Sequence, residues 1–521
     1  MCLDNTSNYI LLYFVIQKDK LYSVGLHLLS NIRVTHSGLV NLLTGLARVV
    51  AAFVFITLVT RSLSVEEFGQ YNLVLSITVY VVTSHWIISY WTTREIARGN
   101  TSGKTAILSS GIFSSIGTFI FLIIGMSVSN SSNLELNTII LAGALIPLQF
   151  LHNILNHISV GWRPQIASYG NLFLELAKVP LAFLFLFMFG MELNGVFLSL
   201  ILGFLASISI MLYFNRNQLR VGFSLTILKT WLSRFWLPGY QMLATIIYTF
   251  DFLIVVILAS PEVVGFYAAI LAIGSLVSHS NLVTVGAYPK LLGNGRGKYL
   301  NENFRLLLYF SILFSTLSIV FAKAGLFILN PIYEVVSVGV IFITIRYFLF
   351  NISYNFNSML RATETIDEKQ NPTIGEFLKS KLFKIPTIQL FQYVSYILIL
   401  TVSLLLIKSP SSSDLVIFWS IISLLAQIPN TLLICIWMKK EKLIQINFIT
   451  ILKYFVAAVP IYFFNDFLTN IFLDYNANIF ILVPQILLIL SICILSYVGI
   501  TFLIDGNTRQ LLKSIVNELK K

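Results

Sequence analysis

Three ionisable side chains lie deep within long apolar stretches of this 521-residue sequence, where a charge is costly unless water or a partner compensates it. Arg48 is the tenth residue of an apolar run that starts at Leu39, about 14 Å from the nearer end of a helix. Asp251 and Arg346 lie within two later runs. A cation at that depth suits a hydrated cavity that holds an anionic group, so Arg48 and Arg346 are candidate substrate ligands.

Asp251 and Glu175 are acidic residues within two of the apolar runs. A carboxylate inside a membrane can pair with a cation such as Arg48, bind a coupling cation or exchange a proton. The sequence is compatible with all three roles, and Asp251 is our candidate ion-coupling residue. Glu175 lies three residues before Lys178 on one helix, so we expect these two to pair with each other.

Asparagines recur at spacings of three and four residues within two of the runs. Asn153 and Asn156 lie in one run, and Asn351 and Asn355 lie in the other, so each pair shares a side of its helix. Amides on one face can line a polar cavity and bind sugar hydroxyls, or they can hydrogen-bond a neighbouring helix. Both roles are compatible with the sequence, and the four asparagines are candidate substrate-binding residues.

Signatures of soluble enzymes and of bound cofactors are missing from the sequence. It contains no glycine-rich phosphate loop, no H-E-x-x-H and no G-x-S-x-G motif. His152 and His157 are five residues apart without a third ligand, and the three cysteines have no metal or redox spacing. We therefore expect no enzyme activity, no cofactor and no metal site.

The composition is that of a membrane protein, with 57% hydrophobic and only 11% charged residues. Many apolar runs reach the about 20 residues that cross a hydrocarbon core as a helix. We predict an all-α polytopic membrane protein with about 14 transmembrane helices. The predicted spans are Leu39–Thr60, Tyr71–Trp91, Thr105–Val128, Thr138–Val160, Tyr169–Phe189, Asn194–Phe214, Leu237–Ala259, Val264–Tyr288, Phe304–Lys323, Ile332–Asn355, Ile388–Ile407, Leu415–Trp437, Thr450–Leu468 and Ile479–Ile504.

An internal repeat divides these spans into two sets. Ser64–Tyr71 and Ser260–Tyr267 share the pattern S-x-E-x-x-G-x-Y, and matched positions are 196 residues apart. That interval contains six spans, and an even number keeps both copies the same way up. The repeat therefore predicts two parallel six-helix lobes, followed by two extra C-terminal helices.

The repeated motif has a structural interpretation. A serine followed by glutamates has the spacing and charge of a helix N-cap. The glycines permit close packing between helices, and Tyr71 and Tyr267 are expected at the level of the lipid headgroups. The predicted structural residues are Ser64, Glu67, Gly69, Ser260, Glu262 and Gly265.

The distribution of basic residues predicts the orientation in the membrane. Of the 34 Lys and Arg residues, 27 fall on one side of the predicted spans, counting Arg305 at the start of its span, and three on the other, counting Lys323 at the end of the same span; the other four lie within spans. Both termini are therefore expected in the cytoplasm, and nucleic acid is not needed to explain the net charge of +12. We predict an N-terminal tail at 1–38, lobe 1 at 39–214, a cytoplasmic linker at 215–236, lobe 2 at 237–437, two further helices at 438–504 and a C-terminal tail at 505–521.

The motif and its surroundings resemble a known family. Arg61–Tyr71, followed by Thr93–Arg98, resembles the opening of Wzx-type polysaccharide (oligosaccharide) flippases. Asp251, Ser260–Tyr267 and Tyr288–Leu291 extend the resemblance, which covers the chain from about residue 37 to the last span. These flippases share a superfamily with the multidrug/toxin-extrusion (MATE-like) transporters and the peptidoglycan-precursor lipid flippase.

The resemblance implies a V-shaped bundle of two six-helix lobes around a central cavity. It implies a transporter of the cell membrane that moves a lipid-linked oligosaccharide, the repeat unit of a polysaccharide, from the cytoplasmic to the outer leaflet. Such cavities use Arg or Lys to hold the diphosphate, and Arg48 is the closest candidate by position. The implied partners are the lipid-linked oligosaccharide, membrane lipids and the glycosyltransferases or polymerase of the same pathway.

Two other functions are alternatives. A cation-coupled multidrug or small-molecule antiporter has the same architecture and would use Asp251 for coupling. A polytopic membrane glycosyltransferase or glycan polymerase would place acidic residues such as Glu66 and Glu67 in an exterior loop. The second copy of the motif favours capping, since a catalytic pair of glutamates would not need to be repeated elsewhere in the chain. The sequence also lacks the large exterior loop usual in such enzymes.

Overall fold

Every regular element in the described part of the chain is a helix. The computed structural model describes residues 34–97, 99–220, 222–284, 298–364, 373–407, 411–441, 444, 448–476, 478–506 and 508–510. Within these residues, thirteen helical segments are long and apolar enough to cross a membrane, and they coincide with the second to fourteenth predicted spans. The first predicted span lies within α2 (Val34–Ser62). The predicted all-α, multi-span membrane fold is confirmed.

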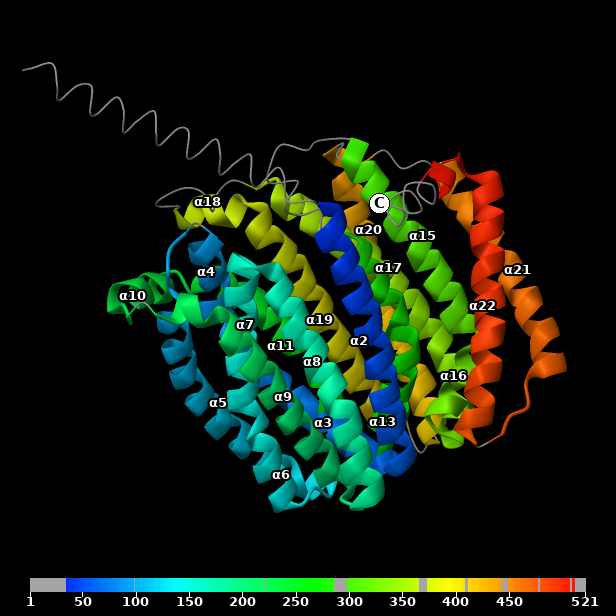
Figure 1. Cartoon of the computed structure of the whole chain (residues 1–521), viewed down its shortest axis with the longest axis horizontal. Helices are drawn as coiled ribbons and strands as arrows, with labels where there is room; N and C mark the ends of the chain where they lie inside the picture. The colour runs from blue at the N-terminus through cyan, green and yellow to red at the C-terminus, as the bar shows by residue number, and fades with distance from the viewer. Residues whose placement is uncertain are drawn as a thin grey trace, which may run out of the picture.

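The predicted lobe 1 is built from long helices that lie side by side (Figure 1). Most of the predicted tails at 1–38 and 505–521, and the segment Tyr288–Leu291, lie outside the described residues. After α2, lobe 1 consists of α3 (Val65–Val82), η1 (Thr83–His85), α4 (Trp86–Ala97), α5 (Gly103–Ser132), α6 (Leu136–Gly143), α7 (Leu145–Trp162), α8 (Pro164–Phe183), η2 (Leu184–Met188) and α9 (Glu192–Asn215).

The linker and lobe 2 follow, and two further helices lie at one edge of the bundle (Figure 1). The linker contains η3 (Arg216–Leu219) and α10 (Leu225–Ser233). Lobe 2 consists of α11 (Trp236–Tyr248), α12 (Phe250–Leu258), α13 (Pro261–Gly274), η4 (Ser275–Thr284), α15 (Lys298–Val320), α16 (Ala322–Leu329), η5 (Pro331–Val336), α17 (Ser337–Ala362), α18 (Ile374–Lys379), α19 (Lys381–Leu406) and α20 (Ser412–Lys440). The last helices, α21 (Phe448–Phe472) and α22 (Ile479–Ile504), pack on each other, on α15 and on α16.

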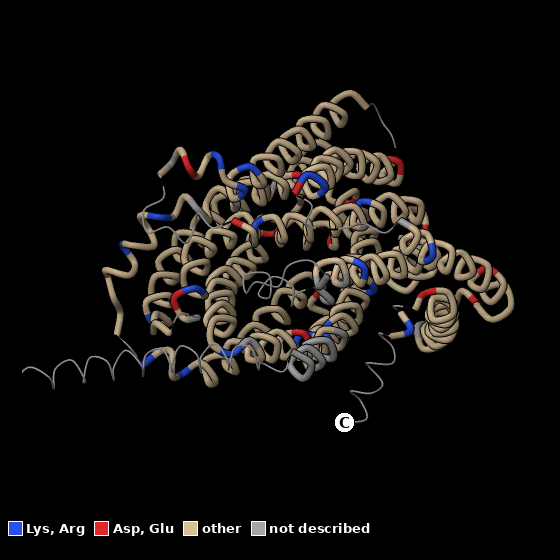
Figure 2. Tube along the Cα trace, turned by 90° about the horizontal axis from the view of Figure 1, so that it is seen from above, with Lys and Arg blue, Asp and Glu red and all other residues tan. Residues whose placement is uncertain are grey.

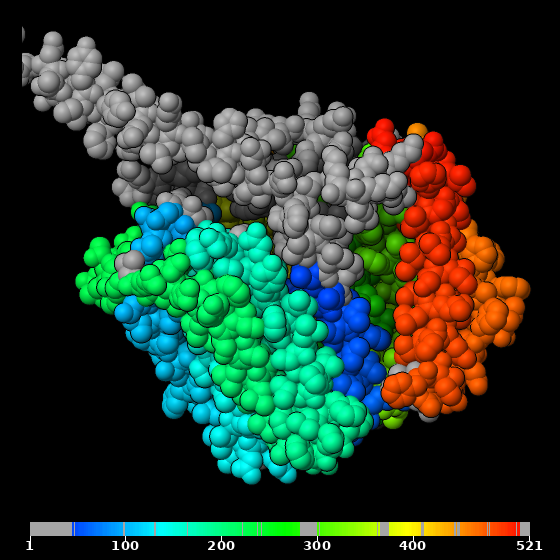
Figure 3. Space-filling view, viewed as in Figure 1, coloured from blue at the N-terminus to red at the C-terminus, as the bar shows by residue number. Residues whose placement is uncertain are grey.

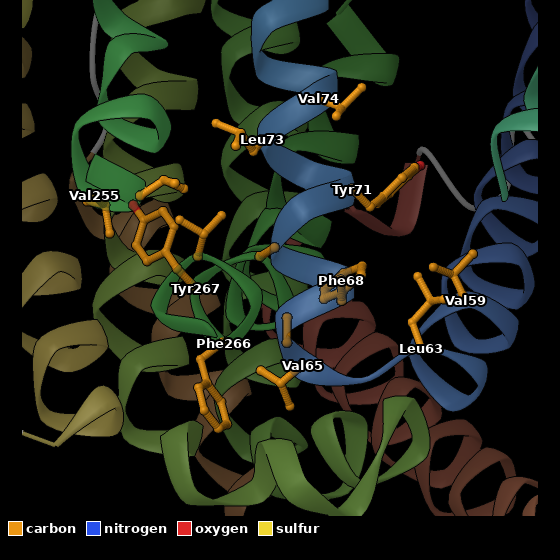
Figure 4. Close-up of a cluster of buried hydrophobic side chains, with 14 of the residues drawn as sticks. Val59, Leu63, Val65, Phe68, Tyr71, Leu73, Val74, Val255, Phe266 and Tyr267 are labelled. Carbon is orange, nitrogen blue, oxygen red and sulfur yellow. The ribbon is translucent and has the colours of Figure 1, made fainter. Parts of the chain in front are cut away.

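The two copies of the repeated motif lie against each other where α3 and α13 meet (Figure 4). A Cβ atom added to Gly69 would lie 1.8 Å from the carbonyl oxygen of Pro261, and one added to Gly265 would lie 2.2 Å from that of Val65. Neither space admits a side chain, so the two helix backbones are in direct contact. We call this end of the bundle the crossing end and the opposite end the basic end.

Helix caps fix where the crossing helices begin. Ser64 Oγ accepts a hydrogen bond from the Glu67 backbone N–H at 3.2 Å, and the Glu67 carboxylate accepts one from the Ser64 N–H at 2.7 Å, which is a capping box. Ser260 Oγ caps α13 through the Val263 N–H, and Pro261 occupies the first helical turn. Each copy of the motif therefore starts its helix with its own side chains.

The tyrosines and the glutamate of the motif differ in exposure. Tyr71 and Tyr267, expected at the level of the lipid headgroups, are 5% and 0% exposed, so their rings are packed inside the protein. The ring of Tyr71 packs against Phe197, and both tyrosines belong to the apolar core. Glu262 is exposed and accepts a hydrogen bond from Ser412 at 3.0 Å. A hydroxyl at the end of a large ring tolerates burial, which a glutamate does not.

The apolar core is continuous between the lobes at the crossing end and divided at the basic end. One cluster joins Phe68 of lobe 1 to Phe266 of lobe 2. Separate clusters surround Ile154 in lobe 1 and Phe356 in lobe 2. Figure 2 views the bundle from the basic end and marks its Lys and Arg residues. This arrangement of the core agrees with the V shape that the resemblance implies.

We expect Gly69→Ala to destabilise the protein, because its new methyl group would overlap a backbone carbonyl that cannot move aside. Overpacking of this kind costs about 1–3 kcal/mol. The control is Gly111→Ala in α5, where an added Cβ meets no atom within 4 Å. Thermal unfolding of the two detergent-solubilised variants measures the difference. Equal melting temperatures would show that the backbones are not in contact at Gly69.

Candidate functional site

Arg48 lies between the two lobes. Its side chain is half-buried on α2, and its Nε is buried with no hydrogen-bond partner among the described residues. The charge of Arg48 acts on His152 of α7 in lobe 1 and on His279 of η4 in lobe 2. The helix that carries Arg48, α2, packs on α8 of lobe 1 and on α16 and η4 of lobe 2, so Arg48 lies on a helix that contacts both lobes.

Glu175 is the acidic residue whose charge acts on Arg48, but it is already paired. Its Oε2 lies 2.7 Å from Lys178 Nζ, which is the ion pair that their spacing predicts. Lys178 Nζ also lies 4.4 Å from the centre of the Phe55 ring on α2. The positive charges of Arg48 and Lys178 therefore share one nearby carboxylate, which leaves a net positive charge beside α2.

Asp251 on α12 is buried inside lobe 2 and is 1% exposed. Its carboxylate accepts hydrogen bonds from the Tyr396 hydroxyl at 2.9 Å and from the Phe252 backbone N–H at 2.8 Å. An ion pair with Arg48, one of the three roles considered for Asp251, is not formed within the part of the chain that the structure describes. Cation binding and proton exchange remain as its candidate roles.

Aromatic side chains connect Asp251 to Arg346. The Tyr396 hydroxyl accepts a hydrogen bond from Trp419 Nε1 at 2.7 Å, and the Trp419 ring stacks on Tyr267 at 3.5 Å between centroids. Arg346 of α17 donates to the Tyr267 hydroxyl at 3.5 Å and to that of Tyr248. We call Asp251, Tyr396, Trp419, Tyr267, Arg346 and Tyr248 the lobe 2 network. Its six members come from six helices.

The candidate asparagines have different environments. Asn351 donates to the Val277 carbonyl at 2.8 Å and to Ser280 at 2.9 Å, so it joins α17 to η4. Asn156 and Asn355 each have a buried side-chain oxygen with no partner among the described residues, and Asn153 is half-buried. Asn351 therefore acts between helices, whereas Asn156 and Asn355 retain free acceptors.

A cluster of three histidines in lobe 1 includes one that the sequence reasoning missed. His85 lies in η1 and contacts Ser89 at 2.8 Å, and its ring centroid is 5.6 Å from that of His157. His152 lies between Asn171 and Ser207. Within the described residues, no group of three or more His, Cys, Asp or Glu residues is placed to hold a metal ion.

Comparisons with known proteins agree on family and fold. The polysaccharide biosynthesis protein family matches residues 34–291. No curated protein matches the sequence. The lipid II flippase MurJ in an inward closed conformation is similar, with a TM-score of 0.57 and 14% identity over 90% of this chain and 100% of that chain. A multidrug resistance MATE family transporter of the MOP superfamily, facing inward, gives a TM-score of 0.53 and 15% identity over 78% of this chain and 99% of that chain.

At these identities the solved structures show the fold alone, and the match to the family model shows the family. The chain belongs to the polysaccharide biosynthesis protein family and has the MATE- and MurJ-like fold.

Proposed function

We propose that this protein is a transporter that moves a lipid-linked oligosaccharide from the cytoplasmic to the outer leaflet of the cell membrane. The observation that carries the proposal is Arg48, a cation at membrane depth between the lobes with an unpartnered Nε. Such a group is available to an anionic ligand. A diphosphate that joins a glycan to its lipid is an anion consistent with the family of this chain.

The glycan needs polar partners while it crosses. Each hydroxyl brought into hydrocarbon without a partner costs several kcal/mol. In the proposal, Asn153, Asn156 and Asn355 face the sugar, and the lipid tail stays in the bilayer. Arg346 and Asn351 already bind protein groups, so we assign them to holding the helices of lobe 2.

The proposed direction follows from the charges. We propose that the basic end faces the cytoplasm, because most of the Lys and Arg residues that the structure describes lie there. The lobes share a core at the crossing end and have separate cores at the basic end, which supports entry from the cytoplasm. An anionic headgroup that moves outward then gains about 2.3 kcal/mol per charge for each 100 mV of inside-negative potential.

Asp251 is the proposed ion-coupling residue. Its carboxylate is buried, and its hydrogen-bond donors within the described residues are the Tyr396 hydroxyl and a backbone N–H, neither of which is a cation. Binding of a proton or a metal cation would neutralise it, and Tyr396 and Trp419 would carry the change to Tyr267 at the crossing end. This same buried carboxylate favours the second candidate function, a cation-coupled antiporter of small molecules. Ion flux stimulated by a small cationic drug would support that alternative.

Arg48→Ala should trap lipid-linked glycan on the cytoplasmic side, because the diphosphate loses its charged partner. A hydrogen bond to a charged group is worth about 1.5–3 kcal/mol, so transport should fall roughly ten- to hundred-fold, and Arg48→Lys should keep part of it. Lys453→Ala is the matched control, since Lys453 lies within α21, outside both lobes. Surface glycan and protected lipid-linked glycan are measured in cells that depend on this protein. Normal surface glycan with Arg48→Ala would remove Arg48 from the mechanism.

Asp251→Asn should abolish stimulation of transport by an ion gradient, because an amide neither binds a proton nor attracts a cation. Transport driven by membrane potential alone should persist. The experiment compares proteoliposomes with imposed pH, sodium or potential gradients, and Asp466→Asn on the exposed face of α21 serves as the control. Full gradient stimulation of Asp251→Asn would contradict the coupling role.

Hydrogen bonds between the lobes at the crossing end should hold that end closed. Arg61 of α2 donates to the carbonyls of Phe327 at 2.8 Å and Ile328 at 3.0 Å, and Asn330 donates to the Thr60 carbonyl at 3.0 Å. Arg61→Ala removes two of these bonds, worth about 1 kcal/mol each, and should raise the open-to-closed ratio at least tenfold.

Spin labels at Asn137 and Val335, which are exposed at the crossing end of lobe 1 and lobe 2, measure that ratio as a distance distribution. Lys323→Ala is the control. This substitution also removes one positive charge, but the ion pair that it breaks, Lys323 Nζ to Glu334 Oε1 at 2.9 Å, lies within lobe 2. Identical distributions for the Arg61→Ala and Lys323→Ala variants would show that these bonds do not hold the end closed.

A further inference from the structure

The linker between the lobes combines exposed apolar side chains with basic ones. Residues 215–236 contain four Lys or Arg residues and no Asp or Glu. Arg216, Arg220 and Lys229 are exposed. Four large apolar side chains are also exposed, by 39% to 55%: Phe223, Leu225, Leu232 and Phe235. In Figure 3 the green surface of this segment lies at the edge of the molecule.

The linker is fixed to lobe 1 at the level where the spans end. A Cβ atom added to Gly103, at the start of α5, would lie 2.6 Å from the Gln218 carbonyl oxygen. The Ser224 backbone N–H donates to Thr105 Oγ1 at 3.0 Å. Trp231 of α10 is buried in the lobe 1 core at the basic end. Figure 1 shows α10 across the ends of the spans.

The side chains of α10 form three sectors around its axis, as 3.6 residues per turn dictates. Leu228 and Trp231 face the protein and are 9% and 1% exposed. Leu225 and Leu232 form the adjacent sector, which is apolar and exposed, and Lys229 borders it. Thr230 lies on the opposite side. A helix with this order of sectors can rest on protein with one side, on acyl chains with the next and on headgroups with the third.

We propose that this linker is an interfacial segment that binds anionic phospholipids of the leaflet at the basic end. Leu225, Leu232 and the flanking phenylalanines enter the acyl region. Arg216 and Lys229 bind the headgroup phosphates. The linker contains no acidic residue that could compete with the lipid phosphates for these basic side chains.

Anionic lipid therefore holds the chain at the junction of the lobes. The linker is pinned to lobe 1 and runs directly into α11, which packs on α4 of lobe 1 and on α19 of lobe 2. A leaflet that binds α10 consequently fixes one lobe relative to the membrane while the other moves. The lipid contact does not depend on which substrate the protein carries.

A first experiment measures where α10 lies. Single nitroxide labels at Leu232 and at Thr230 are compared in bilayers that contain phosphatidylglycerol, with Cys2, Cys435 and Cys493 replaced by serine. The label at position 232 should be more accessible to oxygen than to a water-soluble nickel chelate, and the label at position 230 should show the reverse. Equal access to the nickel chelate at both positions would overturn the proposal.

A second experiment measures the choice of lipid. Purified full-length protein in detergent is titrated with phosphatidylglycerol or phosphatidylcholine, and a polarity-sensitive fluorophore at position 232 reports binding. Each basic residue near an anionic surface contributes about 1 kcal/mol, so Arg216→Gln with Lys229→Gln should raise the phosphatidylglycerol dissociation constant about 30-fold. Lys439→Gln with Lys440→Gln removes two exposed charges from α20 at the same end and should change it little. An equal loss in the control pair, or equal binding of phosphatidylcholine, would refute a specific site on the linker.

Discussion

The structure depends on a contact between two helix backbones at Gly69 and Gly265. A single methyl group at either position would collide with a carbonyl of the other copy, so this approach exists only because both side chains are hydrogen. Caps at Ser64 and Ser260 begin both helices, and the contact lies in their first two turns. The lobes are thus joined tightly at one end by main chain. At the basic end each lobe has its own apolar cluster, so the main chain does not join the lobes there as it does at the crossing end.

The charged side chains within the bundle have two kinds of surroundings, and this difference supports different roles for them. Arg346 and Asp251 lie inside lobe 2, where hydroxyls and rings surround them. Arg48 lies on α2, which contacts both lobes, and Glu175, the carboxylate whose charge acts on it, lies 2.7 Å from Lys178 Nζ. A cation in that position is stable only with water or an anionic ligand beside it. Compensation within lobe 2 makes a fixed network, and the unpartnered Nε of Arg48 is what supports the proposal that it binds an anionic ligand.

Patterns that are local in sequence predicted their part of the structure. Apolar run lengths gave the spans, and the spacing of Glu175 and Lys178 gave their ion pair. The partners of Asp251 could not be found this way, since Tyr396 is 145 residues distant and tyrosine is common in membrane helices. The burial of Tyr267 inside the protein was missed for a related reason. Its motif indicates a helix start, where tyrosine often meets headgroups, whereas burial there comes from the packing of α13 between other helices.

The two copies of the repeat share the residues of the joint but not the charged residues within the spans. The shift of 196 residues that aligns the glycines places Arg48 opposite Ala244, Asp251 opposite Phe55 and Arg346 opposite Phe150. None of the three charges therefore has a charged counterpart. The joint needs a glycine from each copy, because a Cβ atom at either position would meet the backbone of the other. The roles proposed for Arg48 in substrate binding and for Asp251 in ion coupling need no such symmetry. The shared motif therefore accounts for how the two copies pack together, and the charges without counterparts are the residues for which separate roles are proposed.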